Sequence, residues 1–571
     1  MPTKEDIILK YAVKNAMDYG VADVGSVFSK AIHEFPDSKS DMKGLKSLVE
    51  SIVKRVNALT KEELQNEYSK YVTEFEGEYL EKAKRTAKPK MVIEGAIDGE
   101  VVTRFPPEPG GYIHIGNAKQ CILSDEFAKI YHGKIYLYWD DTNPEKCSDE
   151  FVHGIKADTD WLGISFAKEY FASDSIEKIY GYGRELLKQG NAYICSCNED
   201  DIKAKRFSGS ECEHRGSDPS QNIGRFDDMI KDKVPEGESI VRLKGDMRSD
   251  NTAMRDPTLF RIKKFPHFRH GTKYVLWPTY HMNTPILDSI NGVTDVIRSK
   301  EYELWDAVHK MILFNLGLRE PRIHTEARLN INGTTTKKRD IRKLLSEGKI
   351  TGWDDPRLVT IIALRRRGIM PEAIRKFVLR FGMSRTDGTV GIDMLLSENK
   401  SIIDPIAKHF FFVANPLPVK IGGMEGLKVK LKMNPTTDLG FREYSVNGNV
   451  FISAGDISNA DVGHTIRLKD LASIKIKSYS ESVVSEISDG PGRILQWVPS
   501  DMAIKCKIIM PGSLFNKDGS YNRDSIDSVE GYAESMAGEL ALHSIVQFER
   551  FGYCILDQKS ASELTFIYIS K

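Results

Sequence analysis

The stretch Arg104-Phe-Pro-Pro-Glu-Pro-Gly-Gly-Tyr-Ile-His-Ile-Gly-Asn117 decides the fold of this chain. Val101, Val102 and Phe105 predict the end of a buried strand, and the following prolines and glycines force an irregular turn before an apolar helical pattern begins at Ala118. A helix start directs unpaired N–H groups and a partial positive charge outward, which suits a phosphate group. The stretch therefore predicts a strand–turn–helix site for a nucleotide. The alternative, a Pro/Gly-rich surface turn, explains the glycines but not the His-Ile-Gly-Asn that follows them.

This stretch resembles the first nucleotide-binding motif of class I aminoacyl-tRNA synthetases, usually His-Ile-Gly-His, and is most similar to their glutamyl/glutaminyl branch. The resemblance implies catalytic roles for two residues and ATP contacts for three more, namely His114 and Asn117, and then Pro107, Glu108 and Gly116. Asn117 stands where the family has its last histidine. Because an amide can hydrogen-bond but carries no charge, we expect it to assist ATP binding without stabilising the leaving pyrophosphate electrostatically.

Composition narrows the class of protein. A chain of 571 residues is too long for one core, and its length suggests roughly three to four domains. The 81 basic and 81 acidic residues cancel, so an RNA partner requires basic residues gathered on one face, and we expect no DNA partner. Acidic residues in the first thirty positions argue against a signal or transit peptide, and no apolar run approaches the roughly 20 residues that span a bilayer. Seven scattered cysteines are typical of a reduced protein. We therefore predict a cytoplasmic protein with no membrane partner.

The pattern of apolar runs along the chain, together with the resemblance, predicts a multidomain fold built around an α/β Rossmann-type class I catalytic domain. Apolar runs at Val101–Phe105, Ile135–Trp139 and Tyr193–Cys195 are typical of a parallel, doubly wound sheet, which resumes at Tyr274–Tyr280 and Val293–Arg298. Alternating patterns after Asn415, with turns at Asn447-Gly448 and Asp518-Gly519, predict β-barrels at the carboxyl end.

We therefore expect six segments. They are a helical N-terminal extension (1–95), the first half of the catalytic domain (96–195), an inserted acceptor-binding domain (196–272), the second catalytic half (273–340), a helical stem-contact region (341–414) and a β-barrel anticodon-binding region (415–571). The stretch Glu74–Lys90 is heavily charged and predicts a solvated helix that runs into a linker.

Four residues are expected to bind the amino acid. In Tyr136-Leu-Tyr-Trp-Asp-Asp-Thr-Asn-Pro144 two carboxylates follow a strand, where open α/β sheets bind ligands, although a polar strand-ending turn is the alternative. The family resemblance makes Asp140 the partner of the substrate's ammonium group and Tyr280 a pocket residue. It matches Arg298 to the arginine that forks onto glutamate's side-chain carboxylate, a contact that glutamine would not need. Arg104 also matches a glutamate-contacting position. A surface ion pair is the alternative for Arg298.

A cationic segment, Gly333-Thr-Thr-Thr-Lys-Lys-Arg-Asp-Ile-Arg342, falls where the family has its mobile Lys-Met-Ser-Lys-Ser loop. The resemblance places Lys338 at the position of the essential lysine, which would stabilise charge that builds up on pyrophosphate. Lys337 replaces the serine and is expected to contact ATP, and it could share or take over the role of Lys338. A basic loop that merely begins a helix is the alternative.

Cysteine spacing predicts a metal site. Cys195-Ser-Cys197 and Cys212-Glu-His214 together supply three thiolates and an imidazole, a complete tetrahedral set for Zn²⁺ with no open position for water. We therefore interpret it as structural zinc. The alternative is four reduced side chains that lie near one another by coincidence.

Two stretches suit RNA. Arg261-Ile-Lys-Lys-Phe-Pro-His-Phe-Arg-His-Gly271, which includes Arg269, interleaves cations with aromatic rings. Gly352-Trp-Asp-Asp-Pro-Arg357, with Arg365-Arg-Arg367, resembles the family's stem-contact region and makes Arg357 a candidate tRNA contact. Without the resemblance, a solvated loop and a solvated helix face explain both stretches as well.

The resemblance covers about residues 5–571 and is to archaeal-type glutamyl-tRNA synthetases, which end in β-barrels. It implies a glutamate–tRNA ligase that uses ATP and Mg²⁺ and binds tRNA-Glu, or also tRNA-Gln, through the acceptor end, inner stem and anticodon. Two alternatives stay open. One is a glutaminyl enzyme of the same architecture, and the other is a non-catalytic tRNA-binding homologue, suggested by Asn117 and by the altered lysine loop.

Overall fold

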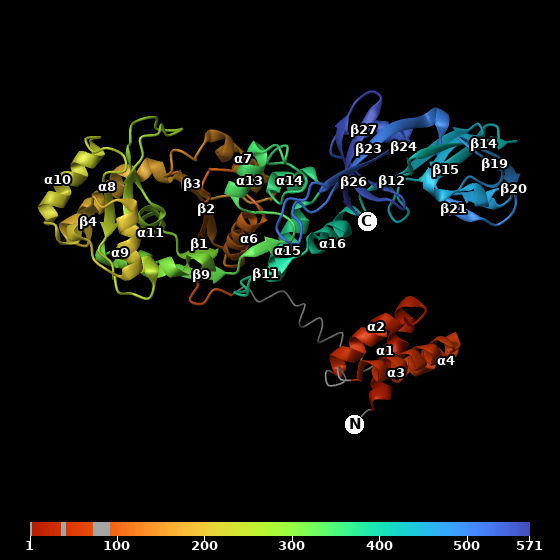
Figure 1. Ribbon diagram of the computed structural model, residues 1–571, viewed down its shortest axis with the longest axis horizontal. Helices are drawn as coiled ribbons and strands as arrows, with labels where there is room; N and C mark the ends of the chain where they lie inside the picture. Colours follow the sequence, from red (N-terminus) through yellow and green to blue (C-terminus); the bar gives the residue numbers. More distant parts are fainter. Residues whose placement is uncertain (1–2, 36–40, 72–91) are drawn as a thin grey trace. The chain divides into compact units, whose positions relative to one another are not determined.

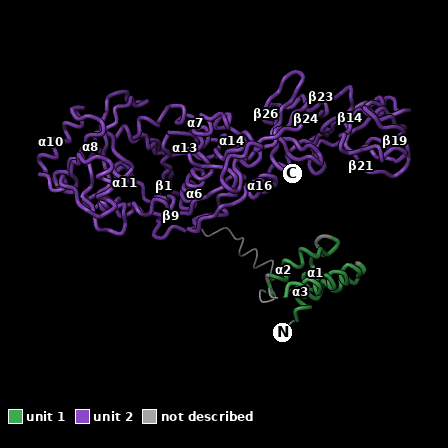
Figure 2. The backbone as a smooth tube through the Cα atoms, in the orientation of Figure 1, with its two compact units in different colours: residues 1–90 green, residues 91–571 purple. Residues whose placement is uncertain are grey.

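The computed structural model describes residues 3–35, 41–71 and 92–571. It divides into two compact units, residues 1–90 and 91–571, each with its own core (Figure 2). Because each core is built from the residues of its own unit, the two are described separately. Among the described residues, no helix is long and apolar enough to cross a membrane.

The first unit is helical, as the sequence predicts. Its described helices are α1 (Lys4–Tyr19), α2 (Val24–Glu34), α3 (Met42–Asn57) and α4 (Lys61–Ser69). All four begin at a residue whose side-chain oxygen accepts a backbone N–H of the first turn: Thr3, Asp23, Asp41 and Thr60. Their apolar faces, including Ile8, Val49 and Ile52, form one buried cluster. The charged helix predicted for Glu74–Lys90 lies outside the described residues.

The predicted parallel sheet is found in the second unit, where Figure 1 labels β1, β2 and β3 next to one another. Strands β1 (Val102–Phe105), β2 (Lys134–Trp139) and β3 (Lys168–Phe171) pair in parallel, as do β8 (Asp295–Ser299) and β9 (Arg322–Glu326). The Thr294 N–H donates to the Val102 carbonyl at 2.9 Å, which sets β8 beside β1. The accompanying helices are α6 (Ile115–Ile130), α7 (Asp149–Trp161), α8 (Ile176–Lys188), α11 (Tyr280–Ile290) and α12 (Asp306–Asn315).

An antiparallel sheet interrupts this arrangement, and it corrects two strand predictions. Its order is β4 (Ala192–Cys195), β5 (Ile240–Leu243), β6 (Thr258–Ile262) and β7 (Leu276–Pro278), with helices α9 (Glu199–Ser208) and α10 (Pro219–Ile230). The runs Tyr193–Cys195 and Tyr274–Tyr280 therefore contribute strands to the antiparallel sheet, and not to the parallel one. A short apolar run shows burial on both faces but not the direction of its partner, and this caused the error.

Helices connect the catalytic sheet to the carboxyl end. They are α13 (Lys338–Ser346), α14 (Ile361–Arg366), α15 (Pro371–Phe381) and α16 (Ile392–Ile403). Strand β10 (Leu329–Ile331), before α13, pairs in parallel with β11 (Gly388–Val390), before α16. Apolar residues of α15 such as Phe377 share a buried cluster with Phe127 and Ile122 of α6. The helical region is thus packed directly on the nucleotide-site helix.

The carboxyl end consists of two barrel-like sheets, as predicted. One has the order β12-β25-β26-β27-β23-β24-β13 and the other β21-β18-β19-β20-β14-β17-β22, with a separate hairpin β15–β16. The bounds are β12 (Lys408–Phe410), β13 (Phe412–Ala414), β14 (Pro416–Gly422), β15 (Leu427–Lys432), β16 (Phe441–Val446), β17 (Asn449–Ser453), β18 (Thr465–Leu468), β19 (Ala472–Tyr479), β20 (Val483–Ser488), β21 (Arg493–Leu495), β22 (Val498–Pro499), β23 (Ala503–Pro511), β24 (Ile526–Glu534), β25 (Ile545–Phe548), β26 (Gly552–Lys559) and β27 (Glu563–Ser570). Gly448 and Gly519 have φ of 74° and 82°, as the predicted turns require.

Candidate active site

The predicted phosphate site is a helix start capped by its own motif. His114 is the N-cap of α6. Its ring Nδ1 accepts the backbone N–H of Gly116 at 3.0 Å, and its backbone N–H donates to Asn117 Oδ1 at 3.2 Å. Burial, together with the charges of Lys338 and Arg328, lowers the pKa of His114 to about 3. The imidazole is therefore neutral at pH 7, and because Nδ1 accepts, Nε2 carries the proton. The imidazole Nε2–H is thus an uncharged donor at the helix start, whose own first N–H groups bond to the Val359 carbonyl and to His114.

One cavity of about 590 Å³ brings together most of the predicted site residues. The predicted residues that line it are Arg104, Pro107, Glu108, His114, Gly116, Asn117, Asp140, Tyr280, Arg298 and Lys338. They come from the first motif, the end of β2, the start of α11, the end of β8 and the lysine segment. Residues far apart in the chain therefore meet in a single cavity large enough for a small substrate and a nucleotide.

The structure distinguishes the two lysines of the cationic segment. Lys338 begins α13 and donates from Nζ to the Glu108 carbonyl at 3.0 Å, and burial lowers the pKa of this amine. Lys337 is the N-cap of α13, is exposed and does not line the cavity. The geometry therefore favours Lys338 over Lys337 as the cation that faces the nucleotide.

A loop from the carboxyl end holds the lysine segment in place. The barrel loop, residues 512–525 between β23 and β24, places Leu514 in a buried cluster with Ile341 and Leu344 of α13. The Phe515 N–H donates to the Gly333 carbonyl at 3.1 Å. Gly333 has φ of 75°, and a Cβ there would lie 2.6 Å from Ser513 Oγ, so only glycine permits this approach.

The expected specificity arginine is buried among polar partners. Arg298 is 3% exposed, and its Nη1 donates to His309 Nδ1 at 3.2 Å and to Tyr280 Oη at 3.4 Å, while Nη2 forms an ion pair with Asp306. Burial and the charge of Arg298 hold the pKa of His309 well below its usual range, so His309 is a neutral acceptor. These contacts fix the guanidinium against the cavity wall.

Asp140 is a half-buried carboxylate with two weakly compensating hydrogen bonds. Asn283 Nδ2 donates to its Oδ1 at 2.9 Å, and Thr142 donates at 3.3 Å. Burial nevertheless raises the pKa of Asp140 to about 6. A cation bound beside this carboxyl group would favour its charged form, so the site is suited to an ammonium ion.

Arg104 has a different environment from the one the resemblance implies. Its Nε and Nη2 fork onto Asp288 at 3.1 and 3.2 Å, and both side chains are almost fully buried. Nη1 donates to the Ile297 carbonyl at 3.5 Å. Three of the five N–H groups of Arg104 are therefore used within the protein, where the side chain links β1 to α11.

Several residues that line the cavity were not predicted from the sequence. These are Gln120, His281, Ser299, Glu301, Tyr302, Trp305, Glu326 and Arg328. His281 and Trp305 stack with ring centroids 3.6 Å apart. Arg328 lies only a few residues before the lysine segment, and a cation so close to a predicted phosphate loop is the one signal that could have found it.

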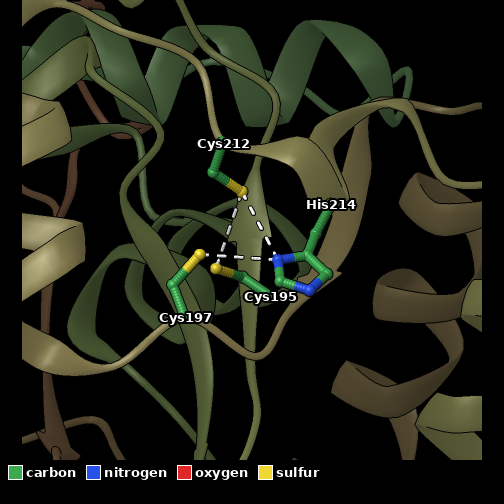
Figure 3. A group of neighbouring side chains, drawn as sticks. All are labelled: Cys195, Cys197, Cys212 and His214. Atoms are coloured by element: carbon green, nitrogen blue, oxygen red, sulfur yellow. Dashed lines mark hydrogen bonds between the residues drawn. The ribbon is translucent and has the colours of Figure 1, made fainter.

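The predicted metal ligands converge, as Figure 3 shows. Cys195 Sγ lies 3.8 Å from Cys212 Sγ, and His214 Nδ1 lies 3.4 Å from Cys197 Sγ and 3.8 Å from Cys212 Sγ. Tetrahedral Zn²⁺ with Zn–S bonds of about 2.3 Å would place two sulfurs about 3.8 Å apart. The donor set therefore fits zinc, with Lys205 Nζ and Arg242 Nη1 each 3.9 Å from a thiol to balance thiolate charge.

The two predicted RNA contacts are engaged within the protein. Arg269 donates to Asp174 at 2.9 Å and stacks 3.7 Å above the Phe171 ring, with 30% of its side chain exposed. Arg357 is 7% exposed and all three guanidinium nitrogens are bonded, to Asp355, to Ser525 and to the Lys349 carbonyl among others. We therefore reinterpret Arg357 as a structural residue that connects the helical region to the barrel loop through hydrogen bonds.

Comparisons with known proteins agree with this architecture. The family model for the catalytic domain of class I (E and Q) tRNA synthetases matches residues 100–402, and two models for the anticodon-binding domains of the same family match residues 407–489 and 494–557. The chain is 38% identical to the glutamate–tRNA ligase of Nitrosopumilus maritimus over 98% of both chains. It is 35% identical to that of Pyrococcus furiosus over 99% of this chain and 100% of the relative.

Among solved structures, the glutamate–tRNA synthetase of Elizabethkingia anophelis aligns with 53% of this chain and 70% of its own at 19% identity and a TM-score of 0.40, a likeness too small to support any inference. The matching family models and relatives make this chain a class I aminoacyl-tRNA synthetase. Within that class, the chain belongs to the glutamyl/glutaminyl (E and Q) family.

The Cys–His group generates a prediction about metal content. Protein purified without chelator should contain about one zinc per chain by mass spectrometry of its metals, because four donors converge with tetrahedral spacing. Cys197→Ser should lower that content and the thermal stability of the insert. Cys506→Ala, a buried cysteine of the barrel, is the control and should keep the full content. A protein without zinc, or one whose zinc is indifferent to Cys197→Ser, would contradict the assignment.

Proposed function

We propose that this chain is a glutamate–tRNA ligase, which activates glutamate with ATP and transfers the glutamyl group to the 3′ end of tRNA-Glu. One observation carries the proposal: a single cavity is lined by phosphate-facing groups, His114 and Lys338, and by an arginine suited to a side-chain carboxylate, Arg298. A nucleotide and an acidic amino acid could therefore lie in contact. As a translation enzyme of this kind, the protein is expected to act in the cytoplasm, with tRNA as its nucleic-acid partner.

The reaction requires no side chain as nucleophile. In the first step the α-carboxylate of glutamate attacks the α-phosphorus of ATP, the bond to the bridging oxygen breaks and pyrophosphate leaves. In the second, a ribose hydroxyl at the 3′ end of tRNA attacks the carbonyl carbon of the adenylate, and AMP leaves with the bonding electron pair. Catalysis then depends on holding the reactants together and on stabilising the charge that develops.

The residues at the phosphate end supply donors. The Nε2–H of neutral His114 would donate to a phosphate oxygen at the start of α6, where the helix dipole favours negative charge, and Lys338 would add the cation for the departing pyrophosphate. Asn117 caps the helix and adds an amide. Mg²⁺ carried by ATP would offset part of the triphosphate charge.

The residues at the amino-acid end provide opposite charges. Arg298, held by His309 and Asp306, would pair with the side-chain carboxylate of glutamate, with Tyr280 beside it. Asp140 would receive the α-ammonium group, whose charge would keep this carboxylate ionised. Glutamine would offer Arg298 a neutral amide in place of a carboxylate, which supports glutamate as the substrate.

A cleft between the barrels is the proposed anticodon site. About 680 Å³ in volume, it is lined by the basic residues Lys430, Lys432, Lys469 and Arg550, and by His409 and Gln547. His409 and Gln547 are register partners on β12 and β25. Their atoms Nε2 and Oε1 are buried without a hydrogen-bond partner among the described residues. Unpaired donors and acceptors beside cations suit a splayed nucleobase and its phosphate.

Replacing Arg298 tests the amino-acid assignment. Arg298→Ala should lower kcat/KM for glutamate by about two orders of magnitude, since lost hydrogen bonds to a charged group cost about 1.5–3 kcal/mol each. The measurement is charging of tRNA-Glu and tRNA-Gln with radiolabelled glutamate and glutamine. Charging by glutamine in the wild type would support the glutaminyl alternative. Binding of tRNA with no charging by either amino acid would support a non-catalytic homologue.

The neighbouring lysines form a matched pair of variants. Lys338→Met should slow glutamate-dependent ATP–pyrophosphate exchange, measured with tRNA present, by about 10²–10³-fold, as loss of a transition-state charge contact does. Lys337→Met should stay close to wild type, because Lys337 is exposed and outside the cavity. The reverse order of effects would show that Lys337 has taken over the role.

The barrel cleft yields a prediction about tRNA affinity. Gln547→Leu should raise KM for tRNA about tenfold or more, because a buried acceptor that reads a base would be lost, while KM for glutamate stays near wild type. Gln558→Leu, an exposed glutamine of the same barrel on β26, is the control. Equal KM values for the two variants would contradict an anticodon role for the cleft.

A further inference from the structure

Helix α9 of the insert presents an aromatic ring to solvent. Phe207 is 89% exposed and is the penultimate residue of this helix, which Figure 1 labels within the insert. A single exposed apolar residue is ordinary on protein surfaces, so exposure alone assigns no role. The surroundings of Phe207 give it one.

The end of α9 is held rigidly. Arg255 Nη1 donates to the carbonyls of Arg206 at 2.8 Å and Phe207 at 3.0 Å. Gly209 ends the helix with φ of 72°, and a Cβ there would lie 2.9 Å from the Met247 carbonyl oxygen. At the other end, Cys197 of the Cys–His group directly precedes the N-cap. Phe207 is therefore held on a fixed support and is not part of a frayed end.

The residue next to Phe207 belongs to the substrate site. Arg206 lines a cavity of about 380 Å³ together with Glu108, Asp140 and Tyr280, residues that also line the larger cavity. Successive side chains on a helix diverge by about 100°, so the end of α9 can present a cation to the cavity and a ring to solvent at once. Lys203, one helical turn before Phe207, forms an ion pair with Glu199 on the same helix.

We propose that Phe207 is a stacking platform for an unpaired base near the 3′ end of tRNA and that Arg206 binds the phosphate that links this base to the terminal ribose. The inference rests on the proposed function, in which the terminal ribose must enter the cavity that Arg206 lines. Single-stranded nucleic acid is recognised by aromatic rings that stack on bases, beside cations that contact the backbone. An exposed ring and a cavity-lining cation on adjacent residues match that chemistry.

Three variants test the platform. Phe207→Ala should lower kcat/KM for tRNA charging about tenfold, as loss of one base stack does, and Phe207→Trp should restore it. Phe314→Ala is the matched control, because Phe314 is also exposed, at 85%, but lies on α12 outside both cavities. Equal charging by Phe207→Ala and Phe314→Ala would overturn the proposal.

Binding measurements separate this proposal from the proposed function. A tRNA with 2-aminopurine in its unpaired 3′ segment should lose fluorescence on binding to wild type and retain it with Phe207→Ala. A tRNA shortened by its unpaired 3′ nucleotides should bind both proteins equally. A binding defect that persists with the shortened tRNA, or quenching that survives Phe207→Ala, would overturn the platform. These binding readouts test the role of Phe207 without requiring the charging reaction. Failure of the wild type to form an adenylate would overturn the proposed function and would leave the binding results valid as a test of Phe207.

Discussion

The contact of helix α13 with the turn after β1 is the interaction on which the site depends. Lys338 Nζ reaches the Glu108 carbonyl at 3.0 Å, and Arg342 bonds to the Gly110 carbonyl. The next residue, Gly111, has φ of 148°, and a Cβ there would lie 2.9 Å from Trp353 and 3.1 Å from Lys338. Bare backbone is therefore what allows the lysine to close on the motif.

Helix α13 links the wall of the cavity to the barrels by direct packing. The barrel loop packs Leu514 under α13, and Arg357 connects Asp355 to Ser525 of the same loop. Because interfaces of packed side chains transmit small displacements, a shift of the barrels would reach Lys338 through α13. Lys338 and the barrel loop thus belong to or pack on the same helix, α13.

The charges of the cavity complement those of the two small substrates. His114 is neutral, so Lys338 and Arg342 supply the positive charge that contacts the first motif, whereas Asp140 and Arg298 present opposite charges for a zwitterionic amino acid. Within the protein, Arg104 and Arg298 each form an ion pair with an aspartate, whereas Asp140 receives only neutral hydrogen bonds such as that from Asn283. The arginines are therefore oriented in advance, and the carboxylate gains most of its compensation from a bound ammonium group.

The sequence by itself determined the strand–turn–helix motif, the convergent Cys–His set and the β-rich carboxyl end, because each depends on local spacing and on alternation of apolar residues. Tertiary structure decided which lysine enters the cavity, that Arg104 is already paired with Asp288, that Arg357 is buried, and that Tyr193–Cys195 belongs to an antiparallel sheet. These outcomes depend on partners as far apart in the chain as Lys338 and Glu108, or Arg357 and Ser525. Spacing along the chain cannot specify them, because they are set by how separate elements pack against one another.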